Sequence, residues 1–181
     1  NNVLGTLYTA RNAPGGYVLV STDKAVNPSC VMGASKRLCE LVAAEHGGVI
    51  VRFGNVLDSA GSVVPRFREQ IAAGGPLTIT HPDVERYFMS IPQAAGLILA
   101  AAALGGNFVY MLEMGAPRKI VDLAREMIEA AGIDKIPIRF IGLRQGEKIS
   151  EVLHYRHERK ERTENPAIYA LHGEMKKVCH R

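Results

Sequence analysis

The sequence predicts an α/β protein with a doubly wound parallel sheet. Short runs that are apolar throughout, the pattern of parallel strands buried on both faces, alternate with helical patterns of about 10–15 residues. The 181 residues are 47% hydrophobic and 22% charged, which are ordinary values for a globular chain. A β-α-β-α order with helices of this length argues for a parallel sheet that is covered by helices.

Apolar runs predict the strands of this sheet. They lie at residues 17–21, 49–53 and 107–111, with a fourth candidate at residues 136–141. No G-x-G-x-x-G motif, the mark of a dinucleotide-binding βα unit, follows any of them. The first seven residues have the pattern of a helix interior without a start signal. We therefore expect this chain to begin in the middle of a fold, with the phosphate-cradling loop outside it.

Start and stop signals predict three helices between the strands. The first covers residues 30–45 and follows a Pro-Ser pair. The second covers residues 90–104, where Ser90 and Gln93 form a capping-box pattern. In the third, at residues 120–131, the apolar side chains share one face.

Charge and cysteine content argue against several classes of function. The net charge is +4, and acidic residues interrupt the basic run at 156–162, so this run is interpreted as a solvated face and no nucleic-acid partner is predicted. Three cysteines without a C-x-x-C spacing fit a reducing cytoplasm. The longest apolar run, residues 94–104, is short of the ~20 residues that span a bilayer.

Reactive side chains concentrate at residues 21–24, where Ser, Thr, Asp and Lys follow the first strand. Ligands of open parallel sheets bind beyond the carboxyl ends of the strands, so these groups are candidates for a donor, an acid and a base. The alternative is a polar turn. Met32 and Lys36 share a helix face, and Lys36 is either a ligand-binding or an exposed lysine. His154 and His157 lack a third ligand, so no metal site is predicted.

Five blocks in the chain resemble the signature of the capsule-type nucleotide-sugar 4,6-dehydratases, which are extended short-chain dehydrogenase/reductases. The blocks are residues 21–28, 31–37, 51–65, 80–89 and 142–148. The resemblance implies the C-terminal part of a Rossmann-like domain with the catalytic segment at 1–60. It also implies a small α/β substrate-binding subdomain, with the remaining sheet elements, at 61–181.

The resemblance implies catalytic roles for the first two blocks. Thr22 would hydrogen-bond the sugar O4, Asp23 would protonate the leaving C6 hydroxyl, and Lys24 would take the C5 proton. Met32 stands where most of these reductases have tyrosine, as in the large membrane-anchored branch of the family. A thioether cannot move a proton, so Asp23, directly or through water, is the candidate for the C4 hydroxyl proton. Lys36 would bind the nicotinamide ribose.

Further residues match cofactor and substrate positions of the family. Asn2 would help to position Lys36 through water, and Ser21 and Arg52 are predicted beside the cofactor. The residues predicted at the substrate are Asn55, Ser62, Arg86, Arg144 and Glu147. Asp58 departs from the family pattern and is expected to place a carboxylate near the substrate phosphates.

Together these matches imply NAD-dependent dehydration of a UDP-N-acetylhexosamine, with UDP-N-acetylglucosamine the first candidate. They also imply a homo-oligomer whose parent protein is membrane-anchored through a preceding region, with the site on the cytoplasmic side. The alternatives are a non-catalytic nucleotide-sugar-binding module or an enzyme similar to the nucleotide-sugar 4-epimerases. The chain by itself is expected to be inactive and to be poorly stable or to self-associate, because its first strand would lack a neighbour.

Overall fold

The computed structural model describes residues 1–13, 16–106, 108–133 and 135–173. They form two compact units, and each is discontinuous in sequence. Unit 1 comprises Asn1–Gly54, Gln93–Glu113 and the chain from Val152 onward. Unit 2 comprises Asn55–Pro92 and Met114–Glu151.

Unit 1 is built on a five-stranded sheet with the order β1-β2-β7-β11-β10. The strands are β1 (Val18–Val20), β2 (Val49–Arg52), β7 (Val109–Leu112), β11 (Ile168–His172) and β10 (Arg159–Arg162). The pairs β1-β2 and β2-β7 are parallel, whereas β11 runs antiparallel to both β7 and β10. The parallel part with its crossover helices confirms the predicted α/β fold class.

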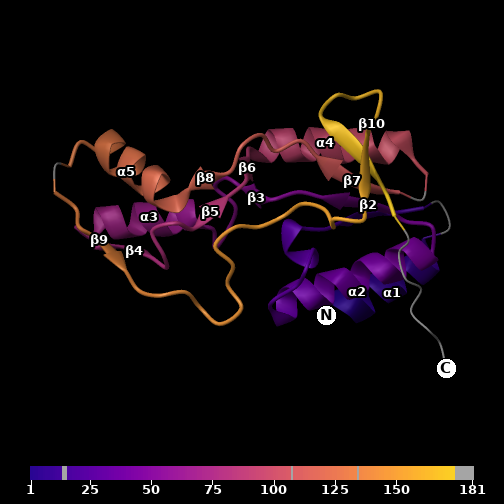
Figure 1. The fold of residues 1–181 in the computed structure, drawn as a ribbon, viewed down its shortest axis with the longest axis horizontal. Helices are drawn as coiled ribbons and strands as arrows, with labels where there is room; N and C mark the ends of the chain where they lie inside the picture. Colours follow the sequence, from indigo (N-terminus) through magenta and orange to yellow (C-terminus); the bar gives the residue numbers. More distant parts are fainter. Residues whose placement is uncertain (14–15, 107, 134, 174–181) are drawn as a thin grey trace. The chain divides into compact units, whose positions relative to one another are not determined.

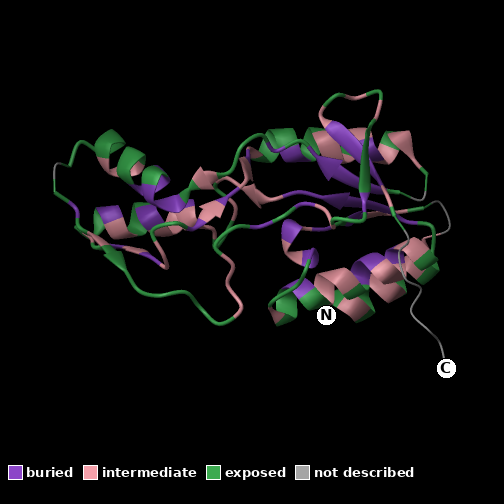
Figure 2. Cartoon of the chain, in the orientation of Figure 1, coloured by how far each residue is buried: buried purple, intermediate pink, exposed green. Residues whose placement is uncertain are grey.

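Helices cover both faces of this sheet. Figure 1 shows α1 (Asn2–Asn12) and α2 (Val31–Glu45) together on one face, and α4 (Ile91–Leu104) on the opposite face. The two central parallel strands, β2 and β7, are buried at every position, as Figure 2 shows. Covering on both faces explains why these strands are apolar without alternation, apart from Arg52 at the end of β2.

Unit 2 packs two helices with three short strand pairs. The helices are α3 (Val63–Ala72) and α5 (Ile120–Ala130). The strand pairs are β3 (Asn55–Val56) with β6 (Phe88–Met89), β4 (Leu77–Ile79) with β9 (Ile138–Phe140), and β5 (Glu85–Arg86) with β8 (Arg118–Lys119). The core lies between the helices and β4, where Phe67, Leu77 and Ala124 are fully buried.

The structure differs from the sequence-based prediction in three respects. The candidate strand at 136–141 is β9, which pairs with β4 in unit 2 and not with the main sheet. Residues 93–113 and the chain from Val152 return to unit 1, where they supply the remaining sheet elements, so unit 1 is discontinuous and does not end at residue 60. Helix α3 and the antiparallel pair β10-β11 were not predicted. Within the described ranges, no helix is long and apolar enough to cross a membrane.

Candidate functional site

A one-turn 3-10 helix, η1 (Asp23–Ala25), holds the predicted catalytic triplet at the carboxyl end of β1. Thr22 is its N-cap, and the Thr22 hydroxyl accepts a hydrogen bond from the Lys24 backbone N–H at 3.4 Å. The backbone N–H of Asp23 donates to the carbonyl of Phe53, which follows β2, at 3.0 Å. The triplet is therefore tied to the ends of two adjacent parallel strands.

The three side chains of the triplet are in direct contact. The Thr22 hydroxyl donates to Asp23 Oδ1 at 2.8 Å, and Lys24 Nζ lies 3.0 Å from the same oxygen. Asp23 is 0% exposed, and its second oxygen, Oδ2, has no hydrogen-bond partner among the described residues. A hydroxyl, a carboxylate and an amine thus share one hydrogen-bonded cluster.

Lys36 lies on the face of α2 that is turned toward this strand end. Its Nζ donates to the carbonyl of Val20, the last residue of β1, at 3.0 Å. Asn2 Nδ2 donates to Ser35 Oγ at 3.2 Å and so reaches the residue next to Lys36. Met32, one turn before Lys36, is 44% exposed. The structure therefore brings Lys36 to the strand that carries the triplet.

Arg52 and Ser21 were predicted beside the cofactor, and the structure places both side chains in a buried ion-pair network. Arg52 is 0% exposed, and its Nε and Nη2 donate to the two carboxylate oxygens of Glu40 at 2.7 and 2.8 Å. Its Nη1 donates to both carboxylate oxygens of Glu158, and Ser21 Oγ donates to Glu40 Oε1. The geometry therefore gives these two side chains a structural role.

The charges of this network stabilise one another. Burial opposes the ionised form of Glu40, but hydrogen bonds and the positive charge of Arg52 outweigh it and hold the pKa of Glu40 below its ordinary value. Burial also opposes the charge of Arg52, and the hydrogen bonds and charge of Glu40 nevertheless raise the Arg52 pKa above its ordinary value. With Glu40 and Arg52 both charged, the network joins α2 and β2 to the segment at residue 158.

The residues predicted at the substrate come together in one pocket of unit 2. This pocket has a volume of about 200 Å³ and includes all five of them: Asn55, Ser62, Arg86, Arg144 and Glu147. Ser62 is the N-cap residue of α3, and its Oγ is buried without a hydrogen-bond partner among the described residues. The pocket thus combines a helix N-terminus with guanidinium groups, which is chemistry suited to an anion.

Arg86 and Glu147 also form hydrogen bonds with the segments around this pocket. Arg86 donates to the backbone carbonyls of Lys148 and Ile149 at 2.9 Å each. Glu147 accepts from the Thr80 hydroxyl at 2.8 Å and from the Arg144 backbone N–H at 3.0 Å. Arg86 is therefore largely engaged with the backbone, whereas the side chain of Arg144 is exposed.

Sequence reasoning missed Arg66 as a pocket residue. It lies on the first turn of α3 and donates to the Thr78 hydroxyl at 2.9 Å, and both residues line the pocket. The available signal was its position directly after the recognised block at 51–65.

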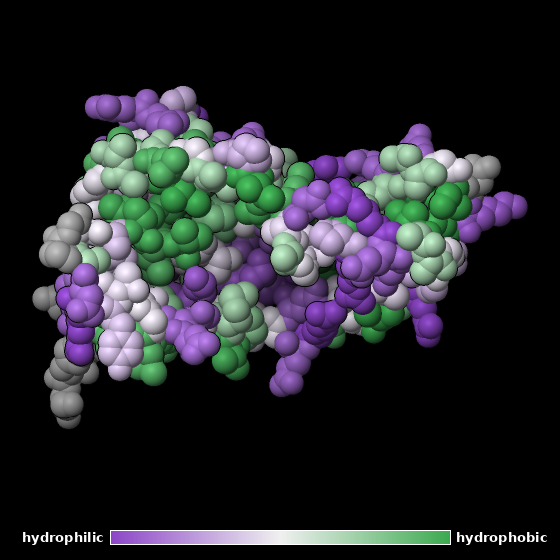
Figure 3. Space-filling model, turned by 180° about the vertical axis from the view of Figure 1, so that it is seen from behind, coloured by the Kyte–Doolittle hydropathy of each residue, from purple (hydrophilic) through white to green (hydrophobic). Residues whose placement is uncertain are grey.

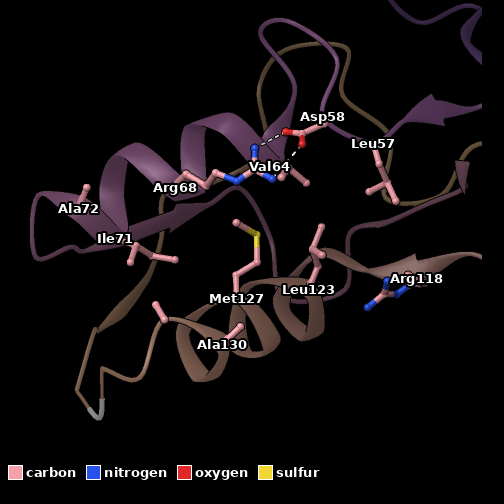
Figure 4. A pocket seen from close by; sticks show the side chains of 11 residues that line it. Leu57, Asp58, Val64, Arg68, Ile71, Ala72, Arg118, Leu123, Met127 and Ala130 are labelled. Atoms are coloured by element: carbon pink, nitrogen blue, oxygen red, sulfur yellow. Dashed lines mark hydrogen bonds and ion pairs between the residues drawn. The ribbon is translucent and has the colours of Figure 1, made fainter. Parts of the chain in front are cut away.

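Asp58, which was expected to place a carboxylate near the substrate phosphates, is not among the residues that line this pocket. Asp58 pairs with Arg68 at the edge of a second pocket, between α3 and α5, shown in Figure 4. Hydrogen bonds from Arg68 hold the pKa of Asp58 below its ordinary value. The second pocket has a volume of about 580 Å³ and a mostly apolar lining, into which Met127 projects from α5.

His154 and His157 do not converge on a common point. His154 Nδ1 lies 2.9 Å from the Tyr155 carbonyl, and the His157 ring stacks on Tyr155 with a centroid distance of 5.3 Å. In the part of the chain that the structure describes, no three His, Cys, Asp or Glu side chains are grouped to hold a metal ion.

The fold of unit 1 and the position of its reactive groups define a class of protein. A mixed sheet of this order, whose parallel strand β1 has Thr22 and Lys36 at its carboxyl end, is a Rossmann-like α/β arrangement. Within this class, the chain belongs to the polysaccharide biosynthesis protein family, whose model matches residues 1–173.

Individual proteins agree with this assignment. The capsular polysaccharide biosynthesis protein CapD of Staphylococcus aureus is 51% identical over 167 residues, which cover 84% of this chain and 28% of CapD. The structure of Pen from Bacillus thuringiensis matches with a TM-score of 0.86 at 28% identity and covers 98% of this chain and 60% of Pen. This chain thus spans only part of the proteins that it resembles.

The dTDP-glucose 4,6-dehydratase DesIV of Streptomyces venezuelae, solved with NAD and TYD bound, matches with a TM-score of 0.73. The match covers 82% of this chain and 55% of DesIV at 21% identity, and at that identity it shows the fold alone.

Proposed function

We propose that this chain carries the catalytic and nucleotide-binding residues of an NAD-dependent nucleotide-sugar 4,6-dehydratase. The proposed substrate is a UDP-N-acetylhexosamine, with UDP-N-acetylglucosamine as the first candidate. The observation that carries the proposal is the contact of Thr22 and Lys24 with one oxygen of the buried Asp23. Dehydration of a sugar needs an acid and a base held next to neighbouring ring atoms, and this cluster supplies both.

The residues at the end of β1 fit a nicotinamide cofactor. An ammonium group has three N–H donors, so Lys36 can bind a ribose hydroxyl while it also donates to the Val20 carbonyl. When bound, NAD would supply a hydride acceptor for the sugar C4 and return the hydride to C6. The positive charge of Lys36 would stabilise negative charge that develops on the C4 oxygen.

The protein side chains would move the protons of the reaction. Asp23 takes the proton of the C4 hydroxyl as the C4–H bond breaks, while Thr22 holds O4 by a hydrogen bond. The neutral Lys24 amine then removes the C5 proton, and Asp23 gives its proton to the C6 hydroxyl, which leaves as water. Lys24 returns a proton to C5 at the end of the cycle. The net change is loss of one water, and both side chains recover their starting states.

The short distance between Asp23 and Lys24 supports these roles. Lys24 Nζ lies 3.0 Å from Asp23 Oδ1, so the acid and the base of the elimination would stand side by side at the carboxyl end of β1.

The pocket of unit 2 is proposed to bind the nucleotide diphosphate. The N-terminus of α3 with Ser62 offers backbone N–H groups, and Arg66 and Arg144 offer guanidinium groups that suit phosphate oxygens. Glu147 would bind the uridine ribose, because a carboxylate accepts hydrogen bonds from both ribose hydroxyls. Asn55 lines the same pocket and would contact the diphosphate.

The test is incubation of the full-length protein with NAD and UDP-N-acetylglucosamine, with mass spectrometry of the product. We expect a 4-keto-6-deoxy sugar that is lighter by one water, and loss of turnover in Lys24→Ala. Lys119→Ala is the matched control, because Lys119 pairs with Asp83 in unit 2 outside the proposed pocket. Absence of the product with a range of UDP- and dTDP-sugars would refute the dehydratase function, and normal turnover of Lys24→Ala would refute the role of Lys24.

A further inference from the structure

Tyr155 lies far from the catalytic triplet in sequence but contacts the turn that carries it. Its hydroxyl donates to the carbonyl of Ala25, the last residue of η1, at 3.0 Å across 130 positions of sequence. Ala25 is 0% exposed, so few other donors can reach this carbonyl. Tyr155 lies in the segment between β9 and β10, and no sequence motif assigned it a role.

The turn needs anchors from outside. A 3-10 turn has poorer hydrogen-bond geometry than an α-helix. In η1 the N–H groups of Ala25 and Val26 donate to the carbonyls of Thr22 and Asp23. The start of η1 is tied to the strand beside it through the Asp23 N–H and the Phe53 carbonyl. The hydroxyl of Tyr155 provides the corresponding tie at its end.

Tyr155 is itself fixed by the buried ion-pair network. Its backbone N–H donates to Glu158 Oε2 at 2.7 Å, and Glu158 is paired with Arg52. The Arg37 and Arg52 guanidinium carbons lie 5.0 and 5.5 Å from the centroid of the Tyr155 ring, within the range of cation–π contacts. Both the backbone and the ring of Tyr155 are therefore fixed by neighbouring residues, which positions its hydroxyl for the hydrogen bond to η1.

We propose that Tyr155 is a positioning residue for the catalytic turn, which it holds through the Ala25 carbonyl. The inference rests on the proposed function, because it assigns to Tyr155 the geometry of Asp23 and Lys24 in the dehydration. It also gives the Arg52 network a role in positioning. The network connects α2, which carries Lys36, with the segment of Tyr155, which contacts the turn of the triplet.

The test compares Tyr155→Phe with Tyr110→Phe in the full-length protein. Both substitutions remove a tyrosine hydroxyl that donates to a backbone carbonyl, because Tyr110 donates to Gly105 at 2.8 Å. The readouts are hydrogen exchange of the Ala25 and Val26 amides, and kcat and KM for the nucleotide sugar. Tyr155→Phe should speed exchange at both amides and lower kcat about tenfold to a hundredfold, since small displacements of catalytic groups have effects of this size. KM should stay within about twofold, because no residue of the nucleotide pocket is changed. Tyr110→Phe should match the wild type in all three.

The outcomes separate this inference from the proposed function. The inference would be overturned if Tyr155→Phe had the same amide hydrogen exchange at Ala25 and Val26, and the same kcat, as Tyr110→Phe. Faster exchange without a fall in kcat, or a fall in kcat without faster exchange, would also overturn it. If the wild type lacks dehydratase activity, the proposed function fails, and unchanged exchange in Tyr155→Phe would then also refute the contact with the turn.

Discussion

Arg52 shows how a charged side chain can be fully buried when each nitrogen of its guanidinium is paired. Every nitrogen of its guanidinium donates to Glu40 or Glu158. The guanidinium carbon lies 5.5 Å from the centroid of the Tyr155 ring. A buried ion pair of this kind is costly to break, because removal of one partner leaves the other charged and without water. The position of α2 against the sheet therefore depends on the charged form of Glu40.

The pKa of Glu40 makes a prediction for acid stability. The folded state holds this pKa below the unfolded value of about 4.3, so the associated stabilisation is complete above about pH 4.3. It is lost as the pH falls through the lower, folded-state pKa. In the full-length protein, Glu40→Gln should lower the urea midpoint of unfolding at pH 7, because the ion pair with Arg52 is lost. The midpoint of this variant should also fall less steeply than that of the wild type between about pH 5 and pH 3, because the variant has no carboxylate at this position to protonate.

Circular dichroism during urea titration measures both effects. Glu126→Gln is the matched control, because Glu126 forms an exposed pair with Arg118 and should retain the wild-type decline. An acid-dependent decline in Glu40→Gln as steep as that of the wild type would show that other carboxylates control the transition.

The sequence was informative where a function depends on neighbouring residues and less so where it depends on distant ones. Thr22, Asp23 and Lys24 are consecutive, and their place after an apolar run was enough to predict a cluster at a strand end. Arg52 also follows an apolar run, but its partners lie 12 and 106 positions away, so no local pattern distinguishes a structural arginine from a ligand-binding one.

At the scale of elements, α2 packs closely on η1. Gly33 lies in the first turn of α2, and a Cβ atom placed there would be 2.3 Å from the Lys24 carbonyl oxygen. Real atoms do not approach so closely, and the backbone of η1 cannot move as a flexible side chain would. The small size of Gly33 therefore allows the helix that carries Lys36 to pack directly on the turn that carries Lys24.

Gly33→Ala should consequently separate α2 from the turn, with loss of turnover and lower stability in the full-length protein. Gly5→Ala is the matched control, because Gly5 is on an exposed face of α1 with nothing within 4 Å of an added Cβ. Alanine is preferred over glycine inside helices by roughly 0.5–1 kcal/mol, so Gly5→Ala should be neutral or slightly stabilising. Thermal unfolding and turnover of both variants check this pair. Wild-type behaviour of Gly33→Ala would show that the contact is less tight in solution.

The elements that could be predicted are those whose burial leaves a clear apolar pattern in the sequence. Strands β2 and β7 are mostly apolar because helices cover both faces of the sheet, and α5 has one clear apolar face. Helix α3 contains Pro65 and three charged residues among ten, which masks its pattern. Strand β10 is charged and exposed at all four positions, so its sequence reads as a loop.

At the scale of the whole molecule, the two edges of the main sheet differ in chemistry. Strand β10 carries only Arg, Lys and Glu, and charged side chains of this kind discourage a further strand from pairing. Strand β1 is Val-Leu-Val, and within the described residues it pairs with β2 alone. Val20 is 44% exposed, and Figure 3 shows apolar side chains gathered on one face of unit 1.

An apolar edge without charge predicts that residues 1–181 alone self-associate. In sedimentation velocity, the mean mass of this chain should rise with protein concentration, whether pairing at β1 or contact between apolar faces drives the association. Val20→Lys and Leu99→Lys separate the two causes, because Leu99 is 72% exposed on α4, away from the β1 edge. If edge pairing dominates, Val20→Lys should restore the monomer and Leu99→Lys should not. A wild-type chain that stays monomeric at every concentration, with one sharp thermal transition, would show that the β1 edge needs no neighbour.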